Sequence, residues 1–501
     1  RIYMEGRGEQ RIGVFLQGPR ITAGGTAFPC VKCHLEDGRG TLEGGVRSAD
    51  ITPFLLTKDY RGTRPSGRAH PPYTDETLAR AITDGRDPAG NILHEAHPRY
   101  KMAAGDLAAL VAYLKVLGRE PVPGVTDNEV RVGMLHPRSG PLAEAASDVK
   151  ALLSGYFEEV NARGGIFGRA LRLVPFPFDP KQPGDDDARA KALVETGNVF
   201  CTVANLGVPV GDNAAKRLSS AEIPSLAPLL IAPESSYGID RYTFHILPSL
   251  RDQGRVMVDF AIDNLFRPGM QAALLYAEDG PGRGGAAGAR EQARERGLLL
   301  PVEESYPPGA FDAPAAVGRL ERAGSGILFF FGGGREANAL LAEADRRGFR
   351  PSFLGPAALI GDSLFSLPHG IAGKVYLSSP ADGIDPGSKG AGEFFRIAKK
   401  YRLRQEHGAF QAMAFAGAML LEEGLRLSGR SVTRSRFVAG LNGLWKFPTG
   451  VTPPLTYNEN RRVGARGASI LTMDQKNRRF LPAAGWREPV GRSQTGGGEV
   501  R

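Results

Sequence analysis

The sequence has few cysteines, no long apolar run and no strong local excess of one charge. Among its 501 residues there are three cysteines, and no uninterrupted apolar stretch approaches the ~20 residues that span a bilayer, so we expect no transmembrane segment. The formal net charge of +9 is spread out, with 17 Lys and Arg against 14 Asp and Glu in residues 1–123. Because the basic residues are not clustered into a stripe of the kind that binds nucleic acid, we expect no nucleic-acid partner.

Motifs for nucleophilic or nucleotide-dependent catalysis are also missing. The sequence contains neither the G-x-S-x-G turn of a serine hydrolase nor the G-x-x-x-x-G-K-[ST] loop that binds phosphates. The stretch GPGRGG at 280–285 lacks the spacing of a dinucleotide-binding loop, and no metal-ligand spacing surrounds His136 or Asp179. The sequence therefore gives no reason to expect an enzyme.

What the sequence does contain is a close group of two thiols and an imidazole. Cys30, Cys33 and His34 form a C-x-x-C-H motif within FPCVKCHLE. In this order the thiols add to the vinyl groups of a haem, and the imidazole becomes the proximal axial ligand of the iron. The motif predicts one covalently attached haem c.

Two other chemistries use a close cysteine pair. A zinc site needs a second pair of ligands, whereas the third cysteine, Cys201, lies in the apolar run VFCTVANL, typical of a buried residue. A thioredoxin-like redox couple lies between a strand and a helix, whereas here the glycine-rich stretches TAGGTAF and EDGRGTLEGG flank the motif. Both alternatives are weaker than haem attachment.

Haem iron in an electron-transfer protein needs a sixth ligand. The candidates that follow the motif are His70, His94, His97 and Met102. Met102 comes just before a predicted amphipathic helix, and a thioether ligand raises the reduction potential of the iron. We expect Met102 to be this ligand, with the three histidines as alternatives.

The first 120 residues resemble a class I c-type cytochrome. The resemblance is carried by the motif from Cys30 to His34, by the PRYKM loop ending at Met102, and by the helix DLAALVAYL with Tyr113. It implies an electron-transfer function and an all-α domain, in which the last helix packs against a first helix that carries the C-x-x-C-H motif. The insertion RGTRPSGRAHPPY departs from the family pattern.

The pattern of apolar and polar residues changes after residue 120. A Pro- and Gly-containing stretch at 121–129 predicts a linker, and short apolar runs then alternate with helix-length patterns, which indicates parallel sheets. The predicted strands lie at 130–135, 171–176, 199–204, 223–228, 271–277, 326–331 and 350–355. Because the pattern starts again near residue 271, we expect two α/β lobes with a ligand cleft between them.

Residues 130–487 resemble the type I periplasmic substrate-binding proteins, which include the branched-chain amino acid receptors of ABC transporters. The stretches that carry the resemblance are RVGMLHPRSGPLAEAASDVKALLSGYFEEVNARGGIFGRAL, NLGVPVGDNAA, LPSLRDQGRVMVDFA, AALLYAEDGPGRGGAAGAREQARERG and FQAMAFAGAMLLEEGLRLSG. The resemblance implies hinge crossings near Pro248, Ser379 and Pro448, with residues 488–501 as a flexible tail.

Candidate ligand contacts follow the predicted strands. Ser139, Gly140 and Pro141 lie between a strand and a helix, where a hydroxyl and free backbone N–H groups can hold an anion such as a carboxylate. The other candidates are Gly207, Val208, Tyr276, Asp279, Arg335 and Phe410. Several of these candidates also have an explanation without a ligand. Ser139, Gly140 and Pro141 could be only a strand-to-helix turn, Arg335 could face the solvent, and Phe410 could belong to the core. An inward Arg335 would favour an acidic ligand.

Together these features predict a haem c electron-transfer protein fused to a solute-binding module. We expect an organic acid or amino acid as ligand, a redox partner protein or dehydrogenase, and a periplasmic location after removal of a signal peptide. Whether an ABC transporter is served stays open. In the alternative hypothesis, the protein is an oxidoreductase component whose two lobes present an organic substrate or quinone to the haem.

Overall fold

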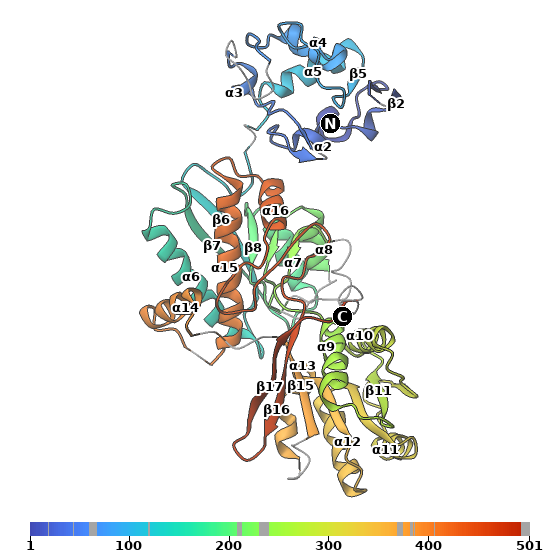
Figure 1. Cartoon of the computed structure of the whole chain (residues 1–501). Helices are drawn as coiled ribbons and strands as arrows, with labels where there is room; N and C mark the ends of the chain where they lie inside the picture. The colour runs from blue at the N-terminus through green and yellow to red at the C-terminus, as the bar shows by residue number, and fades with distance from the viewer. Residues whose placement is uncertain are drawn as a thin grey trace. The chain divides into compact units, whose positions relative to one another are not determined.

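The computed structural model describes all residues except 19, 44, 60–67, 119–120, 208–212, 230–239, 368–373, 381–383, 385, 405 and 492–501. The chain divides into two compact units (Figure 1). The first comprises residues 1–122 and 428–437, and the second comprises residues 123–427 and 438–501.

The N-terminal unit combines short helices with small sheets, so the expectation of an all-α domain needs correction. Its helices are α1 (Ile2–Glu5), η1 (Gly25–Ala27), α2 (Val31–His34), α3 (Pro53–Leu56), α4 (Asp75–Asp84) and α5 (Ala104–Leu114). Strands β1 (Gly13–Leu16), β2 (Ile21–Gly24) and β5 (Arg99–Lys101) form an antiparallel sheet in the order β2-β1-β5, and β3 (Leu42–Glu43) pairs with β4 (Val46–Arg47). Strand β1 forms because Val14 and Leu16 point into the core while Phe15 between them is exposed.

The last helix of this unit packs against α1, the short helix that precedes the C-x-x-C-H motif. The rings of Tyr3 on α1 and Tyr113 on α5 have centroids 5.4 Å apart. Asp106 on α5 accepts hydrogen bonds from the backbone N–H groups of Glu9 and Gln10. Residues from α1, β1, α4 and α5 share one buried apolar cluster, which holds the two ends of the unit together.

The second unit begins with a parallel sheet that forms the first lobe. Its strands, in the order β10-β9-β8-β6-β7, are β10 (Thr243–Phe244), β9 (Ser225–Leu226), β8 (Cys201–Val203), β6 (Glu129–Pro137) and β7 (Ala170–Phe178). The accompanying helices are α6 (Ala143–Ala162), α7 (Asp185–Glu195), α8 (Asn213–Ser220), α14 (Lys389–Lys400), α15 (Gly408–Ser428) and α16 (Arg434–Asn442). Cys201 is fully buried in β8, as its apolar surroundings predict.

The second lobe has a larger mixed sheet in the order β12-β11-β13-β14-β15-β16-β17. Five parallel strands, β12 (Val302–Tyr306), β11 (Gln271–Ala277), β13 (Ser325–Phe331), β14 (Ser352–Pro356) and β15 (Val375–Ser379), are extended by the antiparallel β16 (Ala468–Asp474) and β17 (Arg479–Arg487). Its helices are α9 (Leu250–Phe260), η3 (Ala261–Leu265), α10 (Gly280–Arg296), α11 (Ala313–Arg322), α12 (Gly334–Arg346), α13 (Ala357–Ile360) and η4 (Gly361–Ser366).

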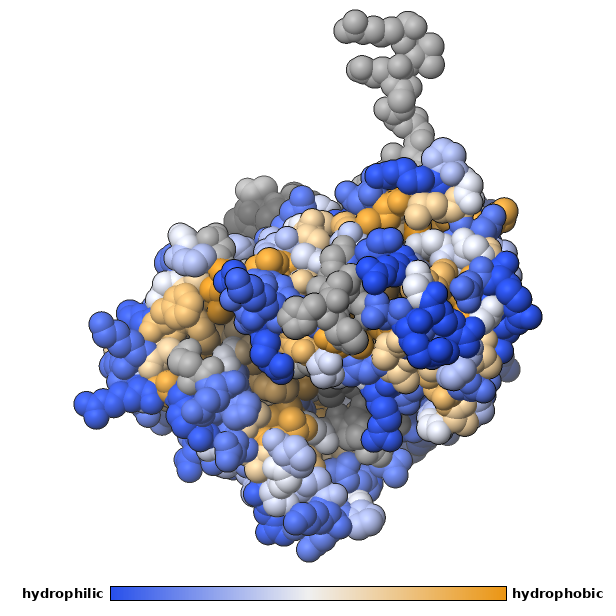
Figure 2. Space-filling model, turned by 90° about the horizontal axis from the view of Figure 1, so that it is seen from below, coloured by the Kyte–Doolittle hydropathy of each residue, from blue (hydrophilic) through white to orange (hydrophobic). Residues whose placement is uncertain are grey.

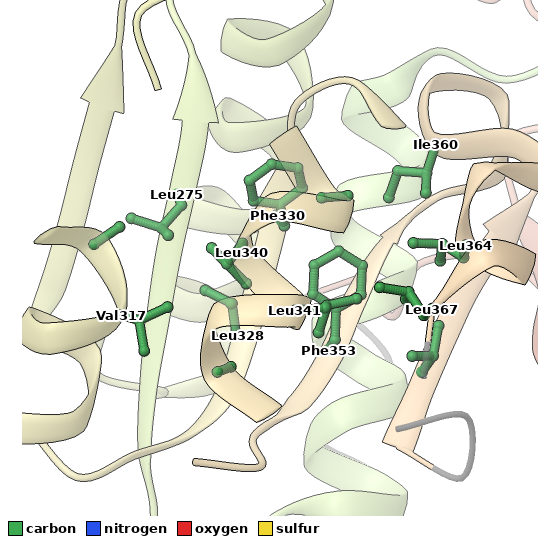
Figure 3. Close-up of a cluster of buried hydrophobic side chains, with 14 of the residues drawn as sticks. Leu275, Val317, Leu328, Phe330, Leu340, Leu341, Phe353, Ile360, Leu364 and Leu367 are labelled. Carbon is green, nitrogen blue, oxygen red and sulfur yellow. The ribbon is translucent and has the colours of Figure 1, made fainter. Parts of the chain in front are cut away.

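Helices cover both faces of this second sheet. Alternate residues of β11 point in opposite directions, so that Leu274 packs beneath α9 and α10 whereas Leu275 packs beneath α11 and α12. Figure 3 shows the second of these clusters, with Phe330 and Phe353 from the strands against Leu340 and Leu341 from α12. Two covered faces explain why the central strands read as continuous apolar runs rather than as alternating patterns.

The chain crosses between the lobes after β10, after β15 and between α16 and β16. Pro248, Ser379 and Pro448 lie in or at the start of these segments. Two crossing segments are hydrogen-bonded to each other, because His245 N–H donates to the Arg462 carbonyl and Gly464 N–H donates to the His245 carbonyl, each over 2.8 Å. These two crossing segments therefore pair through a parallel β-bridge between His245 and Val463.

Figure 2 shows apolar residues in several separate places among hydrophilic ones on the face that it presents. Within the described ranges, we find no helix with both the length and the apolar character that crossing a membrane requires.

Candidate functional site

The C-x-x-C-H motif occupies a single helical turn. Cys30 is the N-cap of α2, and its carbonyl oxygen accepts a hydrogen bond of 2.9 Å from the His34 N–H group. This turn places Cys33 and His34 three and four residues after Cys30, so that both lie on the same side of the helix as Cys30. All three residues are half-buried.

The His34 imidazole is held by a backbone carbonyl. Its Nδ1 lies 2.8 Å from the carbonyl oxygen of Ala49. Burial lowers the pKa of His34, while this hydrogen bond acts in the opposite direction. A ring that donates its Nδ1 proton to a carbonyl has Nε2 available as a metal ligand, which is the common arrangement of ligating histidines.

His97 lies beside His34. The centroids of the two imidazole rings are 6.4 Å apart, with an angle of 65° between the ring planes. Arg99 Nη1 lies 3.2 Å from the His97 Nδ1 atom and also donates to the carbonyl of the same residue. Burial, followed by the charges of His34, Arg99 and Arg68, lowers the pKa of His97 to about 3. The ring is therefore neutral at neutral pH.

The other candidate axial ligands have different surroundings. His70 is buried, stacks edge-on against Tyr73 with centroids 5.1 Å apart, and has its Nδ1 2.7 Å from the Pro71 carbonyl. His94 is exposed, and its Nδ1 accepts a hydrogen bond from Ala96 N–H. Met102 follows β5 and packs, half-buried, against the apolar cluster of the N-terminal unit.

These surroundings favour haem attachment over the two alternative uses of the cysteines. Burial raises the pKa of Cys30 to about 11, whereas a redox-active cysteine has a lowered pKa. Within the described residues, no group of three metal-binding side chains includes Cys30 or Cys33, although a zinc site needs such a group. An imidazole with a free Nε2, two thiols one helical turn apart and an apolar cluster beside them are the donor set that a haem c requires.

In the first lobe, candidate ligand contacts from two loops come together. Ser139, Gly140 and Pro141 lie between β6 and α6, and the Ser139 hydroxyl donates a hydrogen bond of 2.8 Å to Asp179, which follows β7. Gly140 has a left-handed backbone (φ +79°), and a side chain there would meet Pro180. These loops therefore share one edge of the sheet, at the carboxyl ends of its strands.

Gly207 belongs to the same edge. A Cβ atom at Gly207 would lie 3.4 Å from the Phe178 ring and 3.5 Å from Pro137, the last residues of β7 and β6. Below it, the buried amide of Asn205 accepts from Leu135 N–H and donates to Thr202 Oγ1. Val208 lies outside the described residues.

In the second lobe the candidate residues have different roles. Tyr276 packs against the cluster beneath α9 and α10, with the Arg290 guanidinium 5.9 Å from its ring centroid. Asp279 is the N-cap of α10 and accepts from Gly282 N–H over 2.7 Å. Arg335 is exposed in the first turn of α12. Phe410 lies half-buried in the first turn of α15, on the first lobe. The structure brings Asp279 and Arg335 to the carboxyl edge of the sheet, whereas Tyr276 contributes to the core.

Sequence reasoning missed Tyr306, the last residue of β12. Its hydroxyl is buried and has no hydrogen-bond partner in the described part of the chain. A Cβ atom at Gly332 would lie 1.9 Å from this hydroxyl, so the absence of a side chain there makes room for it. Burial raises the pKa of Tyr306, and the charges of Glu336 and Asp279 act in the same direction. No motif marked Tyr306, because β12 is an edge strand that the sequence did not predict.

The carboxyl edges of the two sheets lie on the hinge side of each lobe. The chain leaves the first lobe from the carboxyl end of β10 and leaves the second from the carboxyl end of β15, and both strands are parallel to their neighbours. The loops with Ser139 and Gly207 on one lobe and those with Asp279 and Tyr306 on the other thus lie at the edges that adjoin the hinge. Such edges form the ligand sites of open α/β sheets.

Comparison with known proteins gives one family and many related folds. The family described as "Periplasmic binding protein" matches residues 129–478. Leu/Ile/Val-binding protein homolog 3 of Brucella melitensis is 22% identical over 351 residues, which are 69% of this chain and 92% of that protein. The leucine-, isoleucine-, valine-, threonine- and alanine-binding protein of Pseudomonas aeruginosa is 23% identical over 348 residues, with 69% and 90% covered.

Solved structures share the fold of the two lobes. A branched-chain amino acid ABC transporter protein from Thermus thermophilus with bound valine has a TM-score of 0.56 at 18% identity, covering 74% of this chain and 100% of that one. A fatty acid ABC transporter substrate-binding protein from Thermomonospora curvata has a TM-score of 0.56 at 19% identity, covering 74% and 95%.

Proposed function

Since the chain belongs to the periplasmic binding protein family, we propose that its two-lobed unit binds a small carboxylate-bearing solute and that its N-terminal unit carries a covalently attached haem c. The family is one of periplasmic solute receptors, and haem c is attached outside the cytoplasm. Both parts of the proposal therefore assign the protein to the periplasm.

The observation that supports solute binding is the position of the loops at the carboxyl edges of both sheets. On the first lobe, Ser139 and Gly140 offer backbone N–H groups before α6, which suits a carboxylate. On the second lobe, Asp279, Glu336 and the Tyr306 hydroxyl form an acidic and polar group. An α-amino acid presents a carboxylate to the first set and an ammonium group to the second, whereas a fatty acid satisfies only the first.

Ligand binding is tested by thermal unfolding of the full chain with L-valine, L-leucine and a medium-chain fatty acid. A ligand that binds the native state raises its stability in proportion to the logarithm of its concentration above Kd, by about 2.7 kcal/mol at 100 times Kd. We expect a stabilising effect from the amino acids. No stabilisation by any of the three compounds, with none extracted from denatured protein by mass spectrometry, would contradict the proposed ligand class.

The observation that supports haem attachment is the His34 imidazole, fixed through Nδ1 by the Ala49 carbonyl beside two cysteine side chains. Each thiol adds across one vinyl double bond, with sulfur on one carbon and the thiol hydrogen on the other, so that no oxidant is needed. Cys30 and Cys33 would hold the porphyrin, and His34 would bind the iron. Bound there, haem would let the N-terminal unit accept and donate single electrons.

The proposal about haem is tested by visible absorption after expression in a host with a c-type haem maturation system. We expect a haem spectrum that survives denaturation and acid–acetone extraction, and its loss from the double variant with Cys30→Ala and Cys33→Ala. Haem that extracts completely from the wild-type chain would contradict covalent attachment. If the haem is covalently attached, stopped-flow reduction of the haem-loaded chain tests candidate redox partner proteins.

A further inference from the structure

Two imidazoles can share one metal ion only at a restricted spacing. A metal–imidazole bond is about 2 Å long, and each ring centroid lies about 1 Å behind its ligating nitrogen, so two axial rings have centroids about 6 Å apart. The His34 and His97 rings are 6.4 Å apart. The angle of 65° between their planes poses no obstacle, since two axial rings can rotate about their shared axis.

The two rings differ in which nitrogen carries the proton. His34 Nδ1 lies 2.8 Å from the Ala49 carbonyl and donates to it, so its Nε2 has the lone pair that binds metal. Arg99 Nη1 can only donate, so at 3.2 Å it donates to His97 Nδ1, and the neutral His97 ring carries its proton on Nε2. His97 binds an ion through Nε2 once this proton has moved to Nδ1, and Arg99 then keeps its hydrogen bonds to the His97 and Leu93 carbonyls.

A second observation points to an anionic group at this place. Arg68 Nη1 is buried and has no hydrogen-bond partner among the described residues, although its charge contributes to the low pKa of His97. A buried guanidinium N–H without an acceptor costs free energy, and native proteins rarely leave one unpaired. The carboxylates of a bound haem would supply the missing acceptor, whereas edge-to-face packing of two imidazoles would not.

We propose that His97, rather than Met102, is the second axial ligand of the iron, opposite His34. This inference rests on the proposed haem attachment and deepens it. The role of Met102 is then structural, because its side chain packs against the apolar cluster of the N-terminal unit. A pair of imidazoles gives a lower reduction potential than an imidazole and a thioether, because the thioether favours ferrous iron.

The test uses the full chain loaded with haem and compares His97→Met, His97→Ala and the control Met102→Leu. In the wild type we expect a low-spin ferric spectrum without the near-infrared sulfur-to-iron band. His97→Met should acquire that band and a higher potential. His97→Ala should become high-spin and return to low-spin when imidazole is added. Met102→Leu should keep the wild-type electron paramagnetic resonance and absorption spectra.

A sulfur-to-iron band in the wild type that disappears in Met102→Leu would overturn the assignment of His97 and leave haem attachment intact. A low-spin spectrum unchanged in His97→Ala would overturn it equally. If no haem is attached to the wild-type chain, it is the proposed function that fails. Should His97→Ala fail to fold, the wild type and Met102→Leu alone decide between the two ligands.

Discussion

The Ser139 hydroxyl donates a hydrogen bond to Asp179 Oδ1 over 2.8 Å and thereby ties the loop after β6 to the loop after β7. Asp179 also accepts from Lys181 N–H, and these two donors, the backbone one first, lower the pKa of its carboxyl group. The carboxylate therefore stays ionised well below neutral pH. The loop that we propose for the ligand carboxylate is thus ordered by its own hydrogen bonds.

Replacement of Ser139 by Ala should weaken ligand binding by about ten- to hundredfold. The variant removes the hydrogen bond to the Asp179 carboxylate, roughly 1.5–3 kcal/mol, that orders the loop whose backbone N–H groups we propose to bind the ligand. Isothermal titration with the stabilising amino acid measures the effect. Thr74→Ala is the matched control, because Thr74 caps α4 in the N-terminal unit, outside the two lobes. It should lower stability by about 1 kcal/mol and leave the affinity unchanged. Equal affinities in Ser139→Ala and wild type would show that Ser139 does not contribute to ligand binding.

Two buried tyrosines should respond oppositely to removal of the hydroxyl. Tyr156 donates to Glu422 Oε2 over 2.6 Å, so Tyr156→Phe should lower the free energy of unfolding by about 1.5–3 kcal/mol. Tyr306→Phe removes a buried hydroxyl that lacks a partner in the described residues, so it should leave stability unchanged or raise it by up to about 1 kcal/mol. Urea unfolding measures both changes.

The same Tyr306→Phe variant also tests the ligand site. If the Tyr306 hydroxyl binds the solute, this variant should lose affinity while it keeps its stability. A large loss of stability in Tyr306→Phe would indicate that the hydroxyl has a structural partner instead.

Close packing of α9 against α10 depends on glycine. A Cβ atom at Gly288 would lie 2.0 Å from the Arg251 carbonyl oxygen, whereas one at Gly280, at the start of the same helix, would meet nothing within 4 Å. Gly288→Ala should therefore destabilise the chain by about 1–3 kcal/mol, and Gly280→Ala should be neutral or stabilising by up to about 1 kcal/mol. Thermal unfolding compares them. A Gly288→Ala variant as stable as wild type would show that the helices can separate at little cost.

Acid should lower the free energy of unfolding through His245, which lies in a segment that crosses between the lobes. Burial lowers the pKa of His245 to about 4, and Asp240 only partly opposes this. The unfolded chain binds this proton near pH 6.5, so the native state loses stability as the pH falls from about 6.5 to 4, by roughly 2–3 kcal/mol for this group. His245→Gln should flatten the pH dependence of the free energy of unfolding by that amount. An identical slope in variant and wild type would contradict it.

Local sequence patterns predicted the central strands because those strands are buried on both faces. The apolar runs at 271–277 and 326–331 became β11 and β13 with nearly the same bounds. The antiparallel strands β16 and β17 were not predicted, because they join β15 from about ninety residues further along the chain and their burial alternates only weakly. Nor did the local pattern reveal the small sheet in the N-terminal unit, whose β5 pairs with β1 across most of that unit.

The candidate sites were predictable to the extent that their residues are neighbours in sequence. The C-x-x-C-H motif is local, and α2 presents it on one turn. The approach of His97 to His34 joins residues 63 positions apart, and no spacing rule foretells it. The same holds for Tyr306, whose hydroxyl lies beside Gly332, the residue that follows β13.

The most direct test of the account is the mass of the denatured full chain after maturation with haem and treatment with a thiol-alkylating reagent. We predict a mass greater by one haem and by a single alkyl group, on Cys201, because Cys30 and Cys33 are bound as thioethers. A chain without the haem mass, alkylated at all three cysteines, would contradict the account.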